Sequence, residues 1–231
     1  FCNNHDPPGA LNRFVDVENF RNEGATMLAA SIHLSRGTPY IYMGEEIGMV
    51  DPDYDSMEDY VDVESLNAYQ SLLAEGQSPE AAFRIIKAKS RDNSRTPMQW
   101  DDSVNAGFTT GTPWLKAGKS YPLINVENEI KGPIFTFYQK LIALRKELPI
   151  IAEGSYQPAY EDSPQVYAFE REWQGQKLLV LNNFYADPIT VDILTDYQNG
   201  QVLLSNYGKT QIDHVMTLQP YETLAILVGE N

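Results

Sequence analysis

The segment Gly37-Thr38-Pro39-Tyr40-Ile41-Tyr42-Met43-Gly44 is a short apolar run of aromatic and β-branched residues, bounded by glycine and proline. A run of this length and type predicts a buried strand over residues 40–43. Residues 23–34, just before it, are mostly small and apolar and end at Arg36-Gly37, which predicts a helix with a buried face. Helix followed closely by strand is the rhythm of a parallel sheet or barrel.

His5 and Asp6 end the short segment Phe1-Cys-Asn-Asn-His-Asp6 and are followed directly by Pro7-Pro8-Gly9. The sequence therefore places an imidazole and a carboxylate where the chain turns. An Asp in such a place commonly caps a turn. The ends of parallel barrel strands are also where catalytic side chains lie, which makes the pair a candidate site.

The run Ser90-Arg-Asp-Asn-Ser-Arg-Thr-Pro-Met-Gln-Trp100 brings Arg91 and Arg95 into one loop with acid, amide and indole side chains. Planar guanidinium groups and an aromatic wall suit a carbohydrate pocket. The alternative is a salt-bridge network that only holds the loop. Further along the loop, Trp114 and Tyr121 are expected to serve packing, the alternative being that they line a sugar subsite.

These stretches together resemble the last two strand ends of the (β/α)8 barrel in glycoside hydrolase family 13, the α-amylase clan. The resemblance implies that residues 1–149 are the C-terminal portion of the barrel, with strands seven and eight. It implies that Asp6 stabilises the transition state, that His5 binds the same sugar, and that Arg91 reaches the terminal sugar while Arg95 is structural.

The family's nucleophile and acid/base would lie upstream, in a missing N-terminal segment of the same barrel. Glu45 and Glu46 are then expected to brace the loop, the alternative being that one is a nucleophile. The loop is similar to that of oligo-1,6-glucosidases and cytoplasmic trehalose-6-phosphate hydrolases. This implies a retaining α-glucosidase acting on a small carbohydrate, without a cofactor or metal. The group usually has Gln-Pro-Arg where Pro7-Pro8-Gly9 stands. A non-catalytic carbohydrate-binding module is the alternative from another class.

The pattern changes at Pro149. Upstream, helices are expected over residues 61–75, 79–89 and 133–148, with a long loop over 90–126. Downstream, short alternating segments are separated by turn sequences such as Ala-Asp-Pro and Asn-Gly. This arrangement predicts an antiparallel β-sandwich over residues 150–231. The expected strands are 154–159, 165–173, 177–184, 189–193, 201–204 and 223–228.

The chain has 231 residues and a formal net charge of −15, which argues against nucleic acid or an anionic membrane as partner. Cys2 is the single cysteine, so no disulfide can form within the chain, and a reducing, cytoplasmic location is expected. Acids concentrate in residues 51–64, where a surface loop is the simpler interpretation and a calcium loop the alternative.

Overall fold

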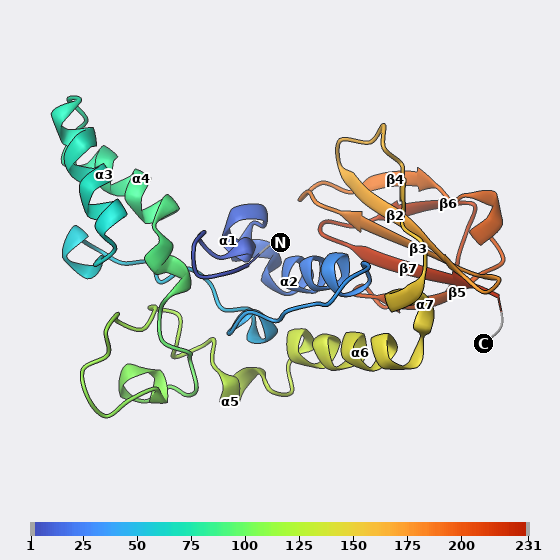
Figure 1. The fold of residues 1–231 in the computed structure, drawn as a ribbon, viewed down its shortest axis with the longest axis horizontal. Coiled ribbons are helices and arrows are strands. Elements are labelled where there is room, and N and C mark those ends of the chain that lie inside the picture. The colour runs from blue at the N-terminus through green and yellow to red at the C-terminus, as the bar shows by residue number, and fades with distance from the viewer. Residues whose placement is uncertain (1–2, 230–231) are drawn as a thin grey trace. The chain divides into compact units, whose positions relative to one another are not determined.

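A computed structural model describes residues 3–229, so Cys2 lies outside the described residues. The chain divides into two compact units, each described by itself: residues 1–13 with 41–132, and residues 14–40 with 133–231. Figure 1 labels the elements. The helices are α1 (Ala10–Phe14), α2 (Val17–His33), α3 (Val63–Ala74), α4 (Pro79–Lys89), α5 (Val126–Glu129), α6 (Pro133–Glu147) and α7 (Pro149–Glu153). The strands are β1 (Gln157–Ala159), β2 (Val166–Trp173), β3 (Gln176–Asn183), β4 (Ile189–Asp192), β5 (Gln201–Ser205), β6 (Val215–Leu218) and β7 (Thr223–Val228).

The first unit is built from loops, short 3-10 turns, the short helix α5, most of the short helix α1 and one helical hairpin. Helices α3 and α4 pack against each other in this hairpin (Figure 1). Each begins at a side-chain cap, Asp62 accepting from the Ser65 backbone N–H and Ser78 from that of Ala81. The hydroxyls of Ser65 and Ser90 are hydrogen-bonded to each other at 2.8 Å, which joins the two ends of the hairpin at its base.

The predicted strand over residues 40–43 is not formed. A strand exists only where a neighbouring strand hydrogen-bonds to it, and all seven strands of residues 3–229 lie between Gln157 and Val228. The helix predicted to begin at residue 61 begins instead at Val63, because Asp62 occupies the capping position. The long loop over 90–126 is confirmed, with short 3-10 turns inside it.

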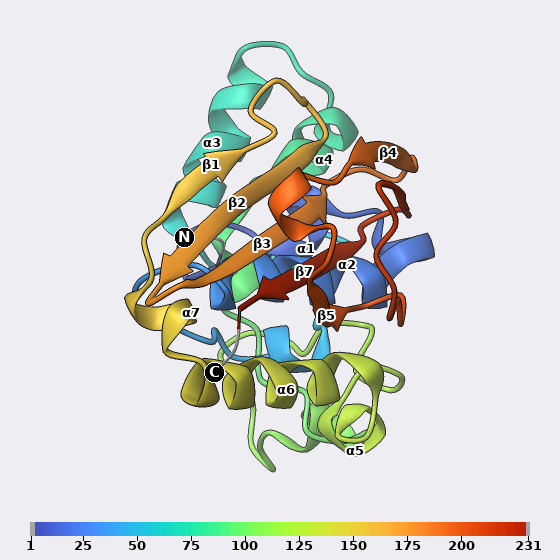
Figure 2. The same ribbon diagram turned by 90° about the vertical axis from the view of Figure 1, so that its right-hand side faces the viewer.

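The second unit contains an antiparallel β-sandwich. One sheet has the strand order β1-β2-β3-β7-β5 (Figure 2), and β4 pairs with β6 in the other. The predicted antiparallel arrangement is confirmed; β6 was not predicted. Side chains of both sheets form one buried cluster, in which Leu179, Leu181 and Ile226 meet Val191 and Leu218.

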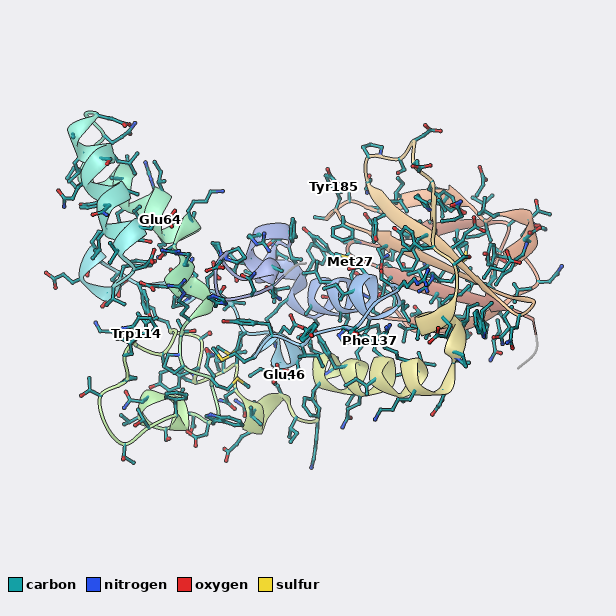
Figure 3. All side chains as sticks on the ribbon, in the orientation of Figure 1. Met27, Glu46, Glu64, Trp114, Phe137 and Tyr185 are labelled. Carbon is teal, nitrogen blue, oxygen red and sulfur yellow. The ribbon has the colours of Figure 1, made fainter. Side chains whose placement is uncertain are left out.

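Helices α2 and α6 lie side by side in the second unit and bury Met27 and Phe137, which Figure 3 labels. The main contacts of the five-stranded sheet with helices are those of α2 and α7, while α6 packs chiefly on α2. Helix α2 passes the loop before it closely: a Cβ at Gly24 would collide with Val15. Only glycine allows that approach.

Candidate functional site

The segment that carries His5 and Asp6 is held by asparagine side chains. The Asn3 amide oxygen accepts from the Ala10 N–H at 2.7 Å, and its nitrogen donates to Glu45 at 2.6 Å. Asn4 accepts from the backbone N–H of Asp6 at 2.7 Å. Asparagine often satisfies the backbone in turns of this kind, and the prolines that follow have no N–H to offer.

The loop after α4 is hydrogen-bonded to the same segment. Residues Arg91–Ser94 form a 3-10 turn. The Ser94 hydroxyl donates to the carbonyl oxygen of Pro7 at 2.5 Å, and Arg95 Nε donates to that of His5 at 2.8 Å. Two stretches some 90 residues apart in sequence therefore form one local structure.

Asp6 lies between a histidine and an arginine. Its Oδ1 is 3.5 Å from His5 Nε2 and 3.4 Å from Arg95 Nη2. The structure thus brings together the predicted His5 and Asp6, and adds Arg95, which the sequence interpretation treated as structural. A carboxylate held beside a cation and an imidazole can accept hydrogen bonds from sugar hydroxyls and stabilise developing positive charge.

Arg91 reaches a different carboxylate. Its Nη2 is 2.6 Å from Asp62 Oδ1 and 3.2 Å from Glu64 Oε2, the latter on the first turn of α3 (Figure 3). The hydrogen bond to Asp62 raises the pKa of Arg91 above its ordinary value. The contacts that lead from Arg91 to Asp6 pass through Asp62 and Arg95, whose Nη1 lies 3.5 Å from Asp62 Oδ1. The Asp6 charge also contributes to the raised pKa of Arg91.

Sequence reasoning missed Asp62, which is buried at the start of α3. Burial raises its pKa, but the hydrogen bonds from Arg91 and Ser65 prevail and hold the pKa below its usual range. The sequence did contain a signal for Asp62. It stands directly before a helical pattern, at the N-cap position, from which its side chain can accept a hydrogen bond from the backbone N–H of Ser65.

A partly buried acid, Asp51, is hydrogen-bonded to both loops. Its Oδ1 accepts from the Gly9 N–H at 3.2 Å, and its Oδ2 accepts from the Asn93 amide at 3.1 Å. Its own N–H donates to Asn12 at 2.8 Å. Burial raises the pKa of Asp51 to about 6, against the opposing effect of these hydrogen bonds and of nearby Arg13.

The remaining acids of residues 51–64 are largely paired with lysines. Asp53 pairs with Lys87, and Lys119 Nζ is 2.5 Å from Asp55 Oδ1. No group of three or more acid, histidine or cysteine side chains in residues 3–229 could hold a metal ion. The lysine pairs are what an acidic surface loop predicts.

Glu45 makes a contact that suits bracing, whereas the hydrogen bonds of Glu46 stay within its own turn. Glu45 accepts the hydrogen bond from Asn3 described above. Burial raises the pKa of Glu46, although backbone hydrogen bonds oppose the shift. The packing role expected for Trp114 is not seen in the described chain: its side chain, labelled in Figure 3, is exposed, while the neighbouring Leu115 is buried.

Comparisons with known proteins identify the family of the chain. The chain matches the model of the α-amylase catalytic domain over residues 1–154 and that of the C-terminal domain of the α-amylase SusG over residues 166–224. The chain belongs to the α-amylase family, glycoside hydrolase family 13.

No helix within residues 3–229 has the length and apolar character needed to cross a membrane.

Relatives of known name cover almost all of the chain. It is 44% identical to an oligo-1,6-glucosidase of Halalkalibacterium halodurans, over 100% of this chain and 42% of that protein. It is 43% identical to a trehalose-6-phosphate hydrolase of Bacillus subtilis, over 97% and 41%. The crystal structure of a trehalose-6-phosphate hydrolase of Bacillus licheniformis superposes with a TM-score of 0.93, at 42% identity, over 99% of this chain and 42% of that one. The chain thus spans less than half the length of these relatives.

Proposed function

We propose that the whole protein is a retaining α-glucosidase and that residues 1–149 supply strand ends seven and eight of its barrel, followed by a sandwich domain over 150–231. The observation that carries the proposal is the grouping of His5, Asp6 and Arg95 on two loops tied together by hydrogen bonds. A prebuilt polar cluster of this kind suits a sugar subsite.

The roles follow from the chemistry. Retaining hydrolysis uses two carboxyl groups roughly 5–5.5 Å apart and an oxocarbenium-like transition state. Those two groups come from barrel segments outside this chain. Asp6 is the third acid, accepting hydrogen bonds from hydroxyls of the sugar and stabilising positive charge on the ring, while His5 donates to the same sugar. Arg91, which is partly exposed, contacts a hydroxyl at the edge of the subsite.

Trehalose 6-phosphate is the substrate we favour, with release of glucose and glucose 6-phosphate. Similarity to hydrolases of that name supports it. An isomaltose-type α-1,6-glucoside is the second candidate, supported by the similarity to oligo-1,6-glucosidases. We also propose a cytoplasmic location, which the single cysteine favours.

The test is hydrolysis of trehalose 6-phosphate, trehalose and isomaltose by the full-length protein and by Asp6→Asn. That variant keeps the shape of the side chain and deletes its charge, so we expect kcat to fall at least 100-fold, on the order of one lost electrostatic stabiliser. Unchanged folding, measured by circular dichroism, is the control. Near-normal turnover by Asp6→Asn would refute the role of Asp6. If the wild type hydrolysed none of the three sugars, the proposed α-glucosidase activity would be refuted.

A further inference from the structure

A single buried carboxylate lies between the two arginines of the candidate site. The Oδ1 atom of Asp62 is 2.6 Å from Arg91 Nη2 and 3.5 Å from Arg95 Nη1. The Asp62 side chain is only 5% exposed, so water contributes little to its solvation. Buried charges of this kind are retained where they are paired, and here both partners belong to the loop that faces Asp6.

The orientation of this carboxylate is fixed by its other oxygen. Oδ2 accepts from the backbone N–H of Ser65 at 3.1 Å and from its hydroxyl at 3.0 Å, which is the N-cap of α3. The backbone N–H of Asp62 donates to Asp92 at 2.9 Å. Because these contacts use one oxygen and the backbone, Oδ1 is left aimed at the arginines.

Charge alternates along the chain of contacts that begins at the Asp6 carboxylate. Arg95 follows at 3.4 Å, then Asp62, then Arg91, which also reaches Glu64 at 3.2 Å. Without the charge on Asp62, Arg91 and Arg95 would face each other with no anion between them. Like charges at such spacing repel, and Arg95 would lose one of the groups that fix its plane.

We propose that Asp62 is a positioning residue of the glycosidase site, which holds Arg95 against Asp6 and Arg91 at the edge of the sugar subsite. The inference rests on the proposed function. Asp62 touches no substrate in this role. It connects the start of α3 to the two arginines, and it fixes Arg95 beside Asp6, the acid proposed to stabilise the transition state.

The competing explanation is that Asp62 serves only as the N-cap of α3. The two roles use different oxygens: Oδ2 caps the helix, and Oδ1 contacts the arginines. Serine is a competent N-cap but is too short to reach the guanidinium groups, so Asp62→Ser keeps the cap and loses the arginine contacts. Asp62→Asn keeps the size and one oxygen but turns an amide or a neutral oxygen toward the arginines. Ser78→Ala is the matched control, because it removes the cap of α4 in the same hairpin.

The experiment uses the full-length protein and whichever of trehalose 6-phosphate and isomaltose it hydrolyses faster. We expect Asp62→Asn and Asp62→Ser each to lower kcat at least 10-fold, with a smaller change in KM. Ser78→Ala should retain the wild-type kcat, although its Tm should fall about as much as that of the Asp62 variants. Combining Asp62→Ser with Arg95→Gln should lower kcat no further than Arg95→Gln alone, because both changes remove the same interaction.

Binding of 1-deoxynojirimycin, a glucose-shaped cation, gives a readout apart from turnover. Calorimetry should show weaker binding to Asp62→Ser and unchanged binding to Ser78→Ala. The inference would be overturned if both Asp62 variants had wild-type kinetics, or if the kcat losses of the single variants multiplied in the double variant. It would also be overturned if Ser78→Ala lost as much kcat as the Asp62 variants. If Asp6→Asn is inactive while the Asp62 variants are normal, only this inference fails. If the wild type neither hydrolyses the sugars nor binds the probe, the proposed function fails, and the inference falls with it.

Discussion

Arg171 Nη1 donates a hydrogen bond to the carbonyl oxygen of Leu34 at 2.9 Å, which ties strand β2 to the end of helix α2. The guanidinium also donates to the carbonyl oxygens of Ile151, Gly154 and Ser155, at 2.8, 2.8 and 2.5 Å. The side chain is 1% exposed. Burial lowers its pKa, and carbonyl dipoles at helix ends supply the compensating negative potential.

Replacing Arg171 by lysine should destabilise the fold strongly. Lysine carries the charge but lacks the planar fork, so several carbonyl oxygens lose their donor. Each buried unpaired acceptor costs about 1–3 kcal/mol, and we expect a total loss of at least ~3 kcal/mol. Urea denaturation of the full-length protein measures it. Lys146→Ala, on the exposed side of α6, is the control and should change stability by less than about 0.5 kcal/mol.

Asp51→Asn should stabilise the protein at neutral pH and not in acid. The pKa of Asp51 rises from 3.8 to about 6 on folding, so the folded state binds a proton that the unfolded chain releases. The Asp51 contribution to stability is therefore favourable at low pH and is lost as the pH rises from about 4 to about 6.

Asparagine removes this dependence. It has one acceptor oxygen, so it can keep the hydrogen bond from the Gly9 N–H but gives up the one from the Asn93 amide, which reduces the gain. A shift of about two pKa units corresponds to a gain of at most about 3 kcal/mol above pH 7. Thermal unfolding from pH 4 to 8 checks this. A gain that is equal at both ends of the range contradicts it.

Substitution of the two arginines should affect different kinetic constants. Arg95 binds the backbone and side chain of the segment that carries Asp6, so Arg95→Gln should lower kcat at least 10-fold. Arg91, at the edge, should mainly raise KM when changed to Gln. Steady-state kinetics on the full-length protein separates the two. Lys116→Ala is the control, since this exposed lysine pairs with Asp59 alone in the salt-bridge geometry. A KM effect for Arg95→Gln with kcat unchanged would reverse the roles.

Gly24→Ala should destabilise α2, although alanine is the better helix former by about 1 kcal/mol. The new Cβ would overlap the Val15 side chain, and overpacking typically costs about 1–3 kcal/mol. The loss should appear as a lower Tm. Gly111→Ala, in an exposed loop with only an ordinary contact at 3.6 Å, should leave Tm unchanged. A stabilising Gly24→Ala would show that Val15 can move aside.

Local signals predicted most of the regular structure. Helix α4 follows from Ser78-Pro79, where cap and first-turn proline are adjacent, and β7 from an apolar run with clear ends. Strand β6 was missed because a short segment becomes a strand only through its pairing with β4, far away in the sequence. The predicted strand over residues 40–43 failed for the same reason, since no described strand pairs with it.

The candidate site was predictable in its residue types but not in its pairing. His5 and Asp6 were placed by their position before a turn. Which arginine meets Asp6 depends on how two distant loops cross, and sequence spacing does not fix that. Asp62 and Arg171 were missed because charged residues usually lie at the surface, and their burial depends on partners from other elements.

The hydroxyl contact between Ser65 and Ser90 has an evolutionary consequence. The chain enters and leaves the helical hairpin at almost the same point, so the closure of residues 66–89 is already fixed at the base. Residues added to a loop whose ends are already held together increase the loop-closure entropy cost only slightly. The length of the hairpin tip can therefore change in evolution at little entropic cost, provided that the contact at its root is kept.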